Sequence, residues 1–365
     1  MQAARPKFSR ERLFQQDLQT RVEERLAALG KAKYGGLQIY SKTVLLLVWA
    51  GASYAGLVTA DRWWQMLPLA VSMGLALAAI GFNIGHDGNH GAFSSVRVTN
   101  RIMGGMYDFL GVSSYVWRWK HNVFHHSYPN VHGLDDDIDL GALCRMSHHQ
   151  RHLPHQRLQH LYMWVLYGLI VPKWQFYDDF MSLSRGRIGD HSFPRPRGFE
   201  LALFVGGKLA FFTWALLLPA LFHPFLVVAL VYLFVSLVQG VTLSIVFQLA
   251  HSNEETHSFS SEDNGVVANR EWAIHQVETT ANFARRNRFL TWYVGGLNHQ
   301  IEHHLFPRLS HVHLPAIADV VERVCRDHGI RYNDHATFRG AVASHFKWLR
   351  SMGRPPEVVA DAEAA

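Results

Sequence analysis

The stretch WWQMLPLAVSMGLALAAIGFNIGHDGNH, residues 63–90, joins a long apolar run to a pair of histidines. Residues 63–85 carry no charged side chain, and a helix that crosses a bilayer needs about 20 such residues. A second uncharged run, residues 43–60, precedes it, and only Asp61 and Arg62 separate the two. So short a connection predicts a hairpin of two antiparallel membrane spans.

Two more apolar runs lie further along the chain, at residues 201–222 and 224–249. The first contains a single charge, Lys208, and the second contains none. Residues 161–172 are also apolar but too short to span, which favours an interfacial or re-entrant helix. The pattern predicts an all-α integral membrane protein with four transmembrane helices and a helical cap outside the membrane.

The rest of the chain is polar and divides around these spans. Residues 1–42 form a basic N-terminal segment, residues 43–350 a single membrane unit, and residues 351–365 an expected disordered tail. An even number of spans places both termini and every histidine cluster on one side. Lys and Arg gather on that side, as they do in cytoplasmic loops. We therefore expect both termini and the histidine clusters to face the cytoplasm, at a bacterial inner membrane.

Composition excludes several classes of protein. The formal net charge of +6 is explained by cationic flanks of membrane spans, so no nucleic-acid partner is expected. The two cysteines, Cys144 and Cys325, are too few for a disulfide framework or a thiolate metal site. Histidine, with 24 copies, is the unusual residue, and imidazole is the commonest metal ligand.

The histidines form three groups, each near the end of an apolar run. The groups are His86 and His90; His121, His125 and His126; and Gln300, His303 and His304. Residues four apart on a helix share one face, and we expect the span that ends near Gly85 to continue into solvent and carry His86 and His90. One such pair is weak support for a site, because two unrelated surface histidines give the same spacing. Three groups on the same side of the membrane favour a metal centre.

Acidic residues lie in and after these groups. Those inside them, Asp87 and Glu302, are expected to accept hydrogen bonds from ligand N–H groups and so orient the imidazoles. The run after the second group has either the same role or that of a solvated acidic loop; it contains Asp135, Asp136, Asp137 and Asp139.

Seven histidines exceed the three protein ligands of a catalytic zinc, so two metal ions are the natural number. Ligation by nitrogen without thiolate suits iron, zinc, copper or nickel, and redox chemistry favours iron. A metal transporter or sensor is the competing class. It would need ionisable ligands inside the spans, whereas the three groups lie just outside them.

The three groups resemble the histidine boxes of membrane fatty acid desaturases. The resemblance rests on HDGNHGAFS (residues 86–94), KHNVFHHSYPN (residues 120–130) and GGLNHQIEHHLFP (residues 295–307), and covers roughly residues 60–320. The third box is similar to that of front-end acyl desaturases of the linoleoyl, delta-6 type, in which Gln replaces the first histidine. The resemblance implies two irons, oxygen as co-substrate, and removal of two hydrogens from an acyl chain to give a cis double bond.

The resemblance also implies site residues and partners. Besides the boxes, it implies that His251, at the end of the last span, is a metal ligand, with His257, His275 and His299 as weaker candidates. The substrate would be a fatty acyl chain on CoA or on a lipid of the bilayer. An alkyl-chain, sphingoid-base or carotenoid hydroxylase is the alternative, because the same di-iron site can hydroxylate.

Two features depart from the family pattern. Three residues separate His121 from the histidine pair of the second box, where two are commoner. The chain has no His-Pro-Gly-Gly sequence, which marks the fused cytochrome b5-like domain of many front-end enzymes. We therefore expect electrons to come from a separate protein, a ferredoxin or a cytochrome b5-like donor.

Overall fold

The computed structural model describes residues 7–261, 267 and 269–355. Four helical stretches in these ranges are long and apolar enough to cross a membrane, which confirms the predicted spans. They are α2 (Gly36–Thr59); α3 (Trp63–Ile80), continued by η1 (Gly81–Gly85) and α4 (His86–His90); α11 (Phe199–Phe212), continued by η6 (Thr213–Leu217) and η7 (Pro219–Leu221); and α12 (Phe225–His251).

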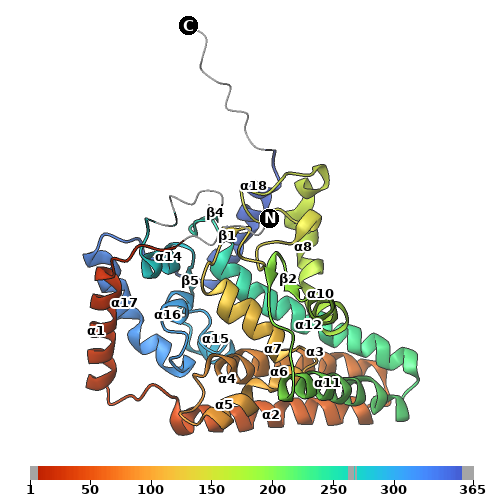
Figure 1. The fold of residues 1–365 in the computed structure, drawn as a ribbon. Helices are drawn as coiled ribbons and strands as arrows, with labels where there is room; N and C mark the ends of the chain where they lie inside the picture. Colours follow the sequence, from red (N-terminus) through yellow and green to blue (C-terminus); the bar gives the residue numbers. More distant parts are fainter. Residues whose placement is uncertain (1–6, 262–266, 268, 356–365) are drawn as a thin grey trace.

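The four spans are connected as two hairpins, of which only α2 and α3 pack along each other, and α12 packs along α3. In Figure 1, α2, α3 and α11 lie together at the bottom and α12 runs diagonally above them. Gly74 allows a close approach, because a Cβ atom there would lie 2.8 Å from the Val235 carbonyl oxygen of α12. The His223 Nε2 atom, in the turn before α12, donates to the carbonyl oxygens of Leu57 and Val58. This contact ties one hairpin to the other.

The first span is longer than the sequence predicts. α2 begins at Gly36 rather than at residue 43, and it includes Lys42, which is buried. Lys42 Nζ donates to His311 Nε2 over 3.1 Å. The ammonium group therefore finds a partner inside the protein, and the helix can continue through a charged residue.

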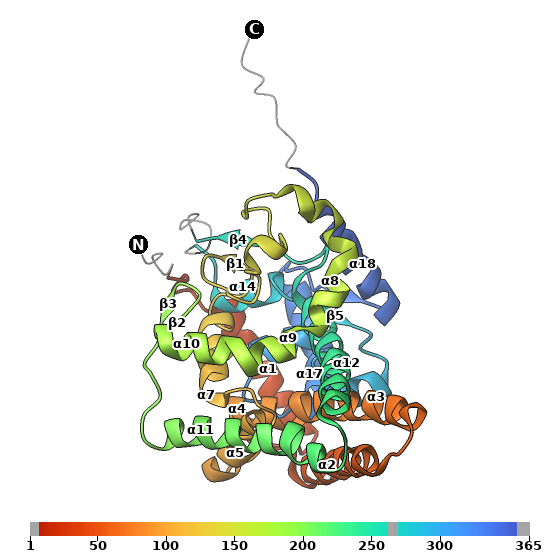
Figure 2. The same ribbon diagram turned by 90° about the vertical axis from the view of Figure 1, so that its right-hand side faces the viewer.

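The segment around residues 161–172 folds as α8 (Gln159–Gly168) and α9 (Ile170–Lys173), which are too short to span, as predicted. Leu161 and Val165 expose an apolar face. Figure 2 shows α12 nearly end-on, with α8 and α9 on one side of it and α3 on the other. Their position at the membrane interface stays a prediction.

The remaining elements form the cap and its connections. Its helices are α1 (Leu13–Ala28), α5 (Arg97–Gly104), α6 (Met106–Phe109), α7 (Ser114–Trp117), η2 (Arg118–His125), η3 (Gly141–Leu143), η4 (Pro154–Leu158), η5 (Trp174–Asp178), α10 (Asp179–Arg185), α14 (Trp272–Glu278), α15 (Arg288–Tyr293), α16 (Gln300–Leu305), η8 (His311–His313), α17 (Leu314–Asp327) and α18 (Phe338–Met352). Two-residue strands pair β1 (Val131–His132) with β4 (Phe259–Ser260), β2 (Arg187–Ile188) with β3 (His191–Ser192), and β5 (Asn282–Phe283) with β6 (Asp334–His335).

One core of the cap forms between its first and last parts. α1 packs along α17 at the left of Figure 1, burying Phe14, Leu18 and Val22. The Glu271 carboxylate accepts from the backbone N–H groups of Phe14 and Gln15, and a negative charge at a helix N-terminus is stabilising. The α1 part of the basic N-terminal segment therefore belongs to the cap.

The expected tail lies largely outside the described residues, which end at residue 355. α18 continues to Met352, so residues 351 and 352 belong to a helix rather than to a disordered tail.

Candidate metal centre

Three of the elements that carry histidines meet the end of α12 where the cap joins the spans. α4 follows α3 without a break, as the sequence predicts, and presents His86 and His90. Both side chains are buried, which corrects the expectation that the span continues into solvent. η2 and α16 approach from the cap, and α12 ends at His251.

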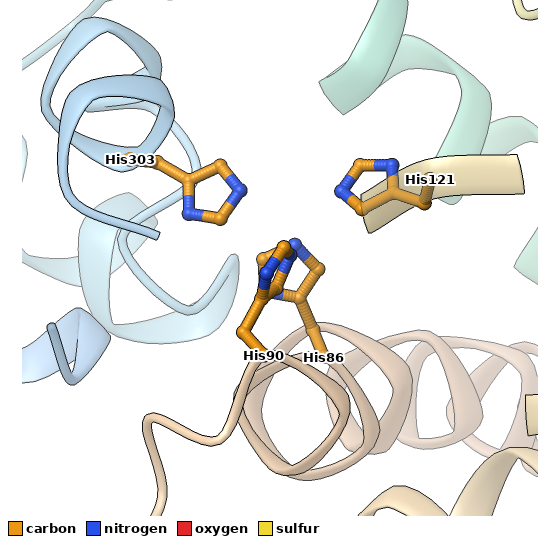
Figure 3. A group of neighbouring side chains, drawn as sticks. All are labelled: His86, His90, His121 and His303. Carbon is orange, nitrogen blue, oxygen red and sulfur yellow. The ribbon is translucent and has the colours of Figure 1, made fainter. Parts of the chain in front are cut away.

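The first cluster contains His86, His90, His121 and His303. One nitrogen atom from each ring lies within 4.8 Å of the others. Figure 3 shows the rings of His86 and His90 rising from one helix, with His121 and His303 on opposite sides of the space they share. The His86 and His303 ring centroids are 4.6 Å apart. Four imidazoles from three distant segments thus face one point.

The second cluster contains His125, His251 and His304, again with one nitrogen each within 4.8 Å. Their ring centroids are 4.7 to 5.1 Å apart. The structure therefore brings His251 to the boxes, as the resemblance implies. Its position follows from α12, which delivers the side chain from the end of the last span.

His126 and Gln300 connect these groups. His126 Nε2 is 3.1 Å from His121 Nε2, in the first cluster. The same ring stacks on His304, in the second cluster, at a centroid distance of 4.3 Å. Gln300 Nε2 lies 3.1 Å from His251 Nε2. All nine residues that the sequence nominates for the site therefore lie in or beside the two clusters.

The unusual spacing of the second box is accommodated by a π-helical turn. η2 has wider turns than an α-helix, and the His126 N–H donates to the His121 carbonyl oxygen, five residues back. A π-helical turn takes up one extra residue and often occurs at functional sites. The three-residue spacer thus leaves His121 and the histidine pair directed to the same side.

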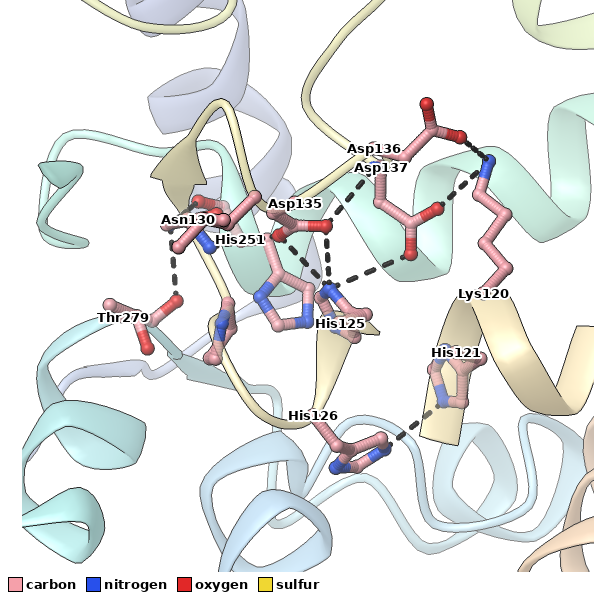
Figure 4. A network of polar contacts seen from close by, with 12 residues as sticks. Lys120, His121, His125, His126, Asn130, Asp135, Asp136, Asp137, His251 and Thr279 are labelled. Carbon is pink, nitrogen blue, oxygen red and sulfur yellow. Dashed lines mark hydrogen bonds and ion pairs between the residues drawn. The ribbon is translucent and has the colours of Figure 1, made fainter. Parts of the chain in front are cut away.

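Two acceptors outside the boxes orient the second cluster. Figure 4 shows the Asp135 carboxylate accepting from His125 Nδ1, over 3.0 Å, and from backbone N–H groups that hold it in place. His304 Nδ1 donates to Gln276 Oε1 over 2.8 Å. Both contacts leave the Nε2 atom directed at the cluster, and such partners also raise the basicity of a metal-binding imidazole.

The sequence only partly indicates these partners. It offers four acidic residues after the second box, and the structure places Asp135 closest to His125 Nδ1. Asp137 lies 3.5 Å from the same nitrogen and also pairs with Lys120. Asp136 pairs with Lys120, and Asp139 accepts from the Gly141 N–H. Gln276 belongs to no motif, and nothing in the sequence connects it with His304.

The acidic residues inside the boxes have other partners. Asp87 accepts from His311 Nδ1 over 2.9 Å. Glu302 accepts from Asn282 and Tyr332, and burial raises its pKa to about 7. Neither carboxylate has a hydrogen bond to a clustered histidine among the contacts of the described residues, so the expectation that they orient box imidazoles is not met.

The weaker ligand candidates lie apart from both clusters. His275 Nε2 donates to the Pro129 carbonyl oxygen. His299 is buried with its Nδ1 atom 3.8 Å from Glu302. Burial lowers the pKa of each to about 3, so both are neutral at physiological pH. The structure groups neither of them with the clustered nitrogen atoms.

The electrostatics of the clusters suit a metal ion. Burial lowers the pKa of His121, His126, His303 and His304 well below the ordinary value, so these rings are neutral and their lone pairs are available. Burial lowers the pKa of His125 as well, but Asp135 raises it above its ordinary value. An imidazole that donates one ring N–H to a carboxylate is typical of metal sites.

Several clustered nitrogen atoms are buried and have no hydrogen-bond partner in the described part of the chain. They are Nδ1 and Nε2 of His86, Nε2 of His90, Nδ1 of His126, Nδ1 of His251, Nε2 of His303 and Nε2 of His304. A buried polar atom without a partner costs about 1–3 kcal/mol. A bound cation would remove that cost, so the residues present fit a metal centre.

A cavity of about 930 Å³ opens beside the clusters and is lined by His121, His125 and His251. Its lining combines charged side chains, including Asp136 and Arg187, with apolar ones, including Leu166 and Ile170. Its volume is at the upper end of the range for small-molecule sites. A long, mostly apolar molecule with one polar end fits this shape and lining.

Four apolar spans and a buried, imidazole-lined centre with an attached cavity define an integral membrane metalloprotein. A family model described as fatty acid desaturase matches residues 62–336. The chain belongs to the fatty acid desaturase family. It is therefore an oxidoreductase with a fatty acyl substrate, and the metal transporter is excluded.

Individual relatives cover nearly the whole chain. The chain is 37% identical to the sn-1 linoleoyl-lipid 6-desaturase of Synechocystis over 354 residues, which is 96% of this chain and 99% of that protein. It is 36% identical to the protein of the same description from Arthrospira platensis, over 95% and 94% of the two chains. The acyl-lipid (8-3)-desaturase of Physcomitrium patens is 34% identical over 91% of this chain and 71% of its own length.

Proposed function

We propose that this protein is a front-end desaturase that introduces a cis double bond into a lipid-linked fatty acyl chain at a di-iron centre. The observation that carries the proposal is the convergence of two buried histidine clusters beside a cavity whose lining includes many apolar side chains. The relatives described as linoleoyl-lipid 6-desaturases favour a lipid-linked linoleoyl chain and the sixth carbon as the position of the new bond.

The proposed ligands divide between two iron ions. His86, His90, His121 and His303 would hold the first, and His125, His251 and His304 the second. His126 lies between the clusters and is available to either. Iron at these positions would supply the activation of oxygen that an unactivated C–H bond requires.

Gln300 is proposed to support His251. Its amide lies 3.1 Å from His251 Nε2, and the opposite ring nitrogen, Nδ1, has no partner in the described part of the chain. A hydrogen bond to one ring nitrogen fixes the tautomer and the orientation of the other. Direct, weak ligation by the amide oxygen is the second role open to this side chain.

The overall reaction follows from the chemistry of the substrate. The acyl chain loses two hydrogen atoms as a carbon–carbon double bond forms. Two electrons and two protons are supplied from outside, and one dioxygen is reduced to two waters. We propose that a separate ferredoxin or cytochrome b5-like protein supplies the electrons, from the cytoplasmic side of a bacterial inner membrane.

The protein itself would position the acyl chain and exclude water from the clusters. The clusters are buried and the cavity reaches them, so an acyl chain in the cavity would lie against the imidazoles. Charged side chains in the lining suit the ester and headgroup, and apolar ones suit the hydrocarbon. Holding the chain in one conformation is what fixes the position and the cis geometry of the product.

The test is expression in a host that makes no polyunsaturated lipid, fed with linoleate, followed by mass spectrometry of the lipids. We expect a product two mass units lighter than linoleate, with a new cis bond at the sixth carbon, and iron in the purified protein. A cell line carrying the empty vector is the control. A hydroxylated product would favour the hydroxylase instead, and no product from a folded, iron-loaded protein would contradict the proposal.

A further inference from the structure

Asn130 ends the second box, in the loop between η2 and β1, and its backbone has an unusual conformation. Its φ angle is +57°, in the left-handed region, and its side chain is only 3% exposed. This region is costly for a residue other than glycine, although asparagine enters it more readily than most. A buried asparagine in this conformation therefore needs contacts that hold it there.

The main chain of Asn130 holds the partner of His125. The Asn130 N–H donates to Asp135 Oδ2 over 2.8 Å, and the same oxygen atom accepts from His125 Nδ1 over 3.0 Å. The Asn130 carbonyl oxygen accepts from the N–H of Phe259, in β4. The left-handed conformation of Asn130 therefore directs its N–H to the carboxylate that orients the His125 ring.

The side-chain amide of Asn130 reaches the ends of two helices. Figure 4 places Asn130 beside His251, the last residue of α12, and Thr279, the residue after α14. Asn130 Nδ2 donates to the carbonyl oxygens of His251, His257 and Thr279 over 2.8, 3.1 and 3.2 Å. Carbonyl oxygens can only accept, so they fix the amide nitrogen toward them. The amide thus supplies a partner that the end of a helix lacks within the helix itself.

α14 connects this amide to the remaining histidine of the second cluster. Gln276, on α14, accepts from His304 Nδ1 through its Oε1 atom over 2.8 Å. A group that bonds to Asn130 therefore holds each histidine of the second cluster: Asp135 holds His125, the main chain at the end of α12 carries His251, and α14 holds His304 through Gln276.

We infer that Asn130 is a positioning residue for the second metal site and sets the spacing of its three ligands. This inference rests on the two metal sites of the proposed function. In the described part of the chain, the hydrogen bonds of Asn130 go to main-chain and carboxylate atoms, so it acts through other residues. The first cluster takes two of its four ligands from α4, which is not among these partners, so a change at Asn130 should fall mainly on the second site.

The experiment compares Asn130→Gly with Gln159→Ala. Glycine adopts a positive φ angle without strain, so the first variant keeps the backbone contact with Asp135 and loses only the amide. Gln159 is also buried, and its Nε2 atom donates to the carbonyl oxygens of Arg145 and Leu349. Each variant therefore loses one buried amide that bridges separate segments, but only the amide of Asn130 leads to a histidine cluster.

Each purified protein is loaded with iron(II), and the iron retained per chain is measured at increasing concentrations of a chelator, with Mössbauer spectra of the same samples. We expect Asn130→Gly to release one of its two irons at a chelator concentration about 10-fold to 100-fold lower than the wild type, the usual effect of losing a support of the metal ligands. The other iron should be released as in the wild type. Gln159→Ala should release both irons as the wild type does.

Three results would overturn the inference. They are wild-type release of both irons from Asn130→Gly, an equal weakening of both irons in that variant, and selective loss of one iron from Gln159→Ala. If Asn130→Gly does not fold, Asn130→Ser keeps one donor and should show the same selective loss with a smaller shift. Wild-type release from folded Asn130→Ser would then overturn the inference.

The proposed function fails in a different way. A wild-type protein that holds two irons but makes no desaturated product would contradict the proposed function and leave the role of Asn130 intact. A wild-type protein that holds fewer than two irons would contradict the two-site centre, and this inference with it.

Discussion

Asp135 and Gln276 each hold one imidazole of the second cluster by its Nδ1 atom. The Asp135 carboxylate bonds to more than the His125 ring, because it also accepts from the backbone N–H groups of Asn130 and Asp137. The carboxylate therefore fixes the loop after η2 and the ring together. At the scale of single residues, the site depends on these partners as well as on the histidines.

Asp135→Asn should lower metal affinity or activity by about 10-fold to 100-fold, the usual effect of losing such a partner. The variant keeps the size of the side chain but removes its charge and one acceptor oxygen. Iron content and product yield at matched protein level are the measurements. Asp139→Asn, on an exposed residue of the same acidic run, is the control. If the iron content and product yield of Asp135→Asn equal those of the wild type, the His125 ring does not need the Asp135 carboxylate as a partner.

Replacing one histidine from each cluster tests the division into two metal sites. His90→Ala and His304→Ala should each abolish activity and lower iron content, because each removes a nitrogen directed into its cluster. His257→Ala, an exposed histidine, is the matched control and should behave as wild type. Full turnover by either cluster variant, with iron retained, would remove that residue from the site.

Gln300 distinguishes a metal ligand from a supporting residue. Gln300→His should keep partial activity, since an imidazole reaches a similar place and can bond to His251 or to a metal. Gln300→Leu should lose nearly all activity, because it leaves the buried His251 nitrogen without a partner, at a cost of about 1–3 kcal/mol. Product yield is the measurement. If Gln300→Leu is as active as the wild type, Gln300 contributes nothing to the activity.

At the scale of elements, η2 explains how a second box with one extra spacer residue still directs its histidines to the clusters. An α-helical turn closes over four residues, whereas the bond from His126 N–H to the His121 carbonyl oxygen closes over five. One residue of the spacer is therefore taken up by the backbone. Val123 is the most exposed of the three spacer residues.

Deleting Val123 should convert this turn to an α-helical one and keep both histidine groups on their clusters. We expect the deletion variant to retain iron and a large part of its activity. Inserting an alanine after Asn122 should instead abolish both, because a second extra residue rotates His121 away from the cluster. Loss of iron in the deletion variant would show that the π-helical turn itself is required.

Lys208, the single charged residue inside the third span, also connects several elements. Lys208 Nζ donates to the Asp179 carboxylate over 2.7 Å and to the carbonyl oxygens of Gly111 and Gln175. All three of its N–H donors are thus used, and the contact ties α11 to α10 and η5. The burial of Lys208 follows from these partners.

Removing one member of a buried ion pair costs about 3–5 kcal/mol, because the other charge is left alone. Lys208→Met should therefore lower the melting temperature markedly, and Asp179→Asn in the same chain should restore part of the loss. Thermal unfolding in detergent of the wild type, both single variants and the double variant measures this. A single variant as stable as wild type would show that the pair contributes nothing.

At the scale of the whole molecule, the arrangement of hairpins allows a test of topology. Both termini and the clusters are expected on the cytoplasmic side, and the loop at Asp61 and Arg62 on the other. A cysteine at Asp61 should react with a membrane-impermeant thiol reagent in intact cells, and a cysteine at Arg326 only after lysis. The reverse pattern would place the metal centre outside the cytoplasm.

Hydropathy and histidine spacing predict the features that depend on residues near in sequence. The four spans, the continuation of α3 through η1 into α4, and the eight box residues at the clusters follow from local patterns, whereas His251 follows from the family resemblance. The contacts of Gln276 with His304 and of Lys42 with His311 do not, because each joins segments separated by many residues and carries no motif. The π-helical turn was also missed, since a spacer of three residues does not reveal its backbone.

The spread of the ligands along the chain has a consequence for biosynthesis. His86 emerges early and His304 late, and the first cluster needs His303 as well. The ribosome must therefore complete most of the chain, and all four spans must be inserted, before any complete cluster exists. If the clusters hold the two proposed ions, metal loading is a late step of maturation, and a chain truncated before α16 would be inserted without either complete cluster.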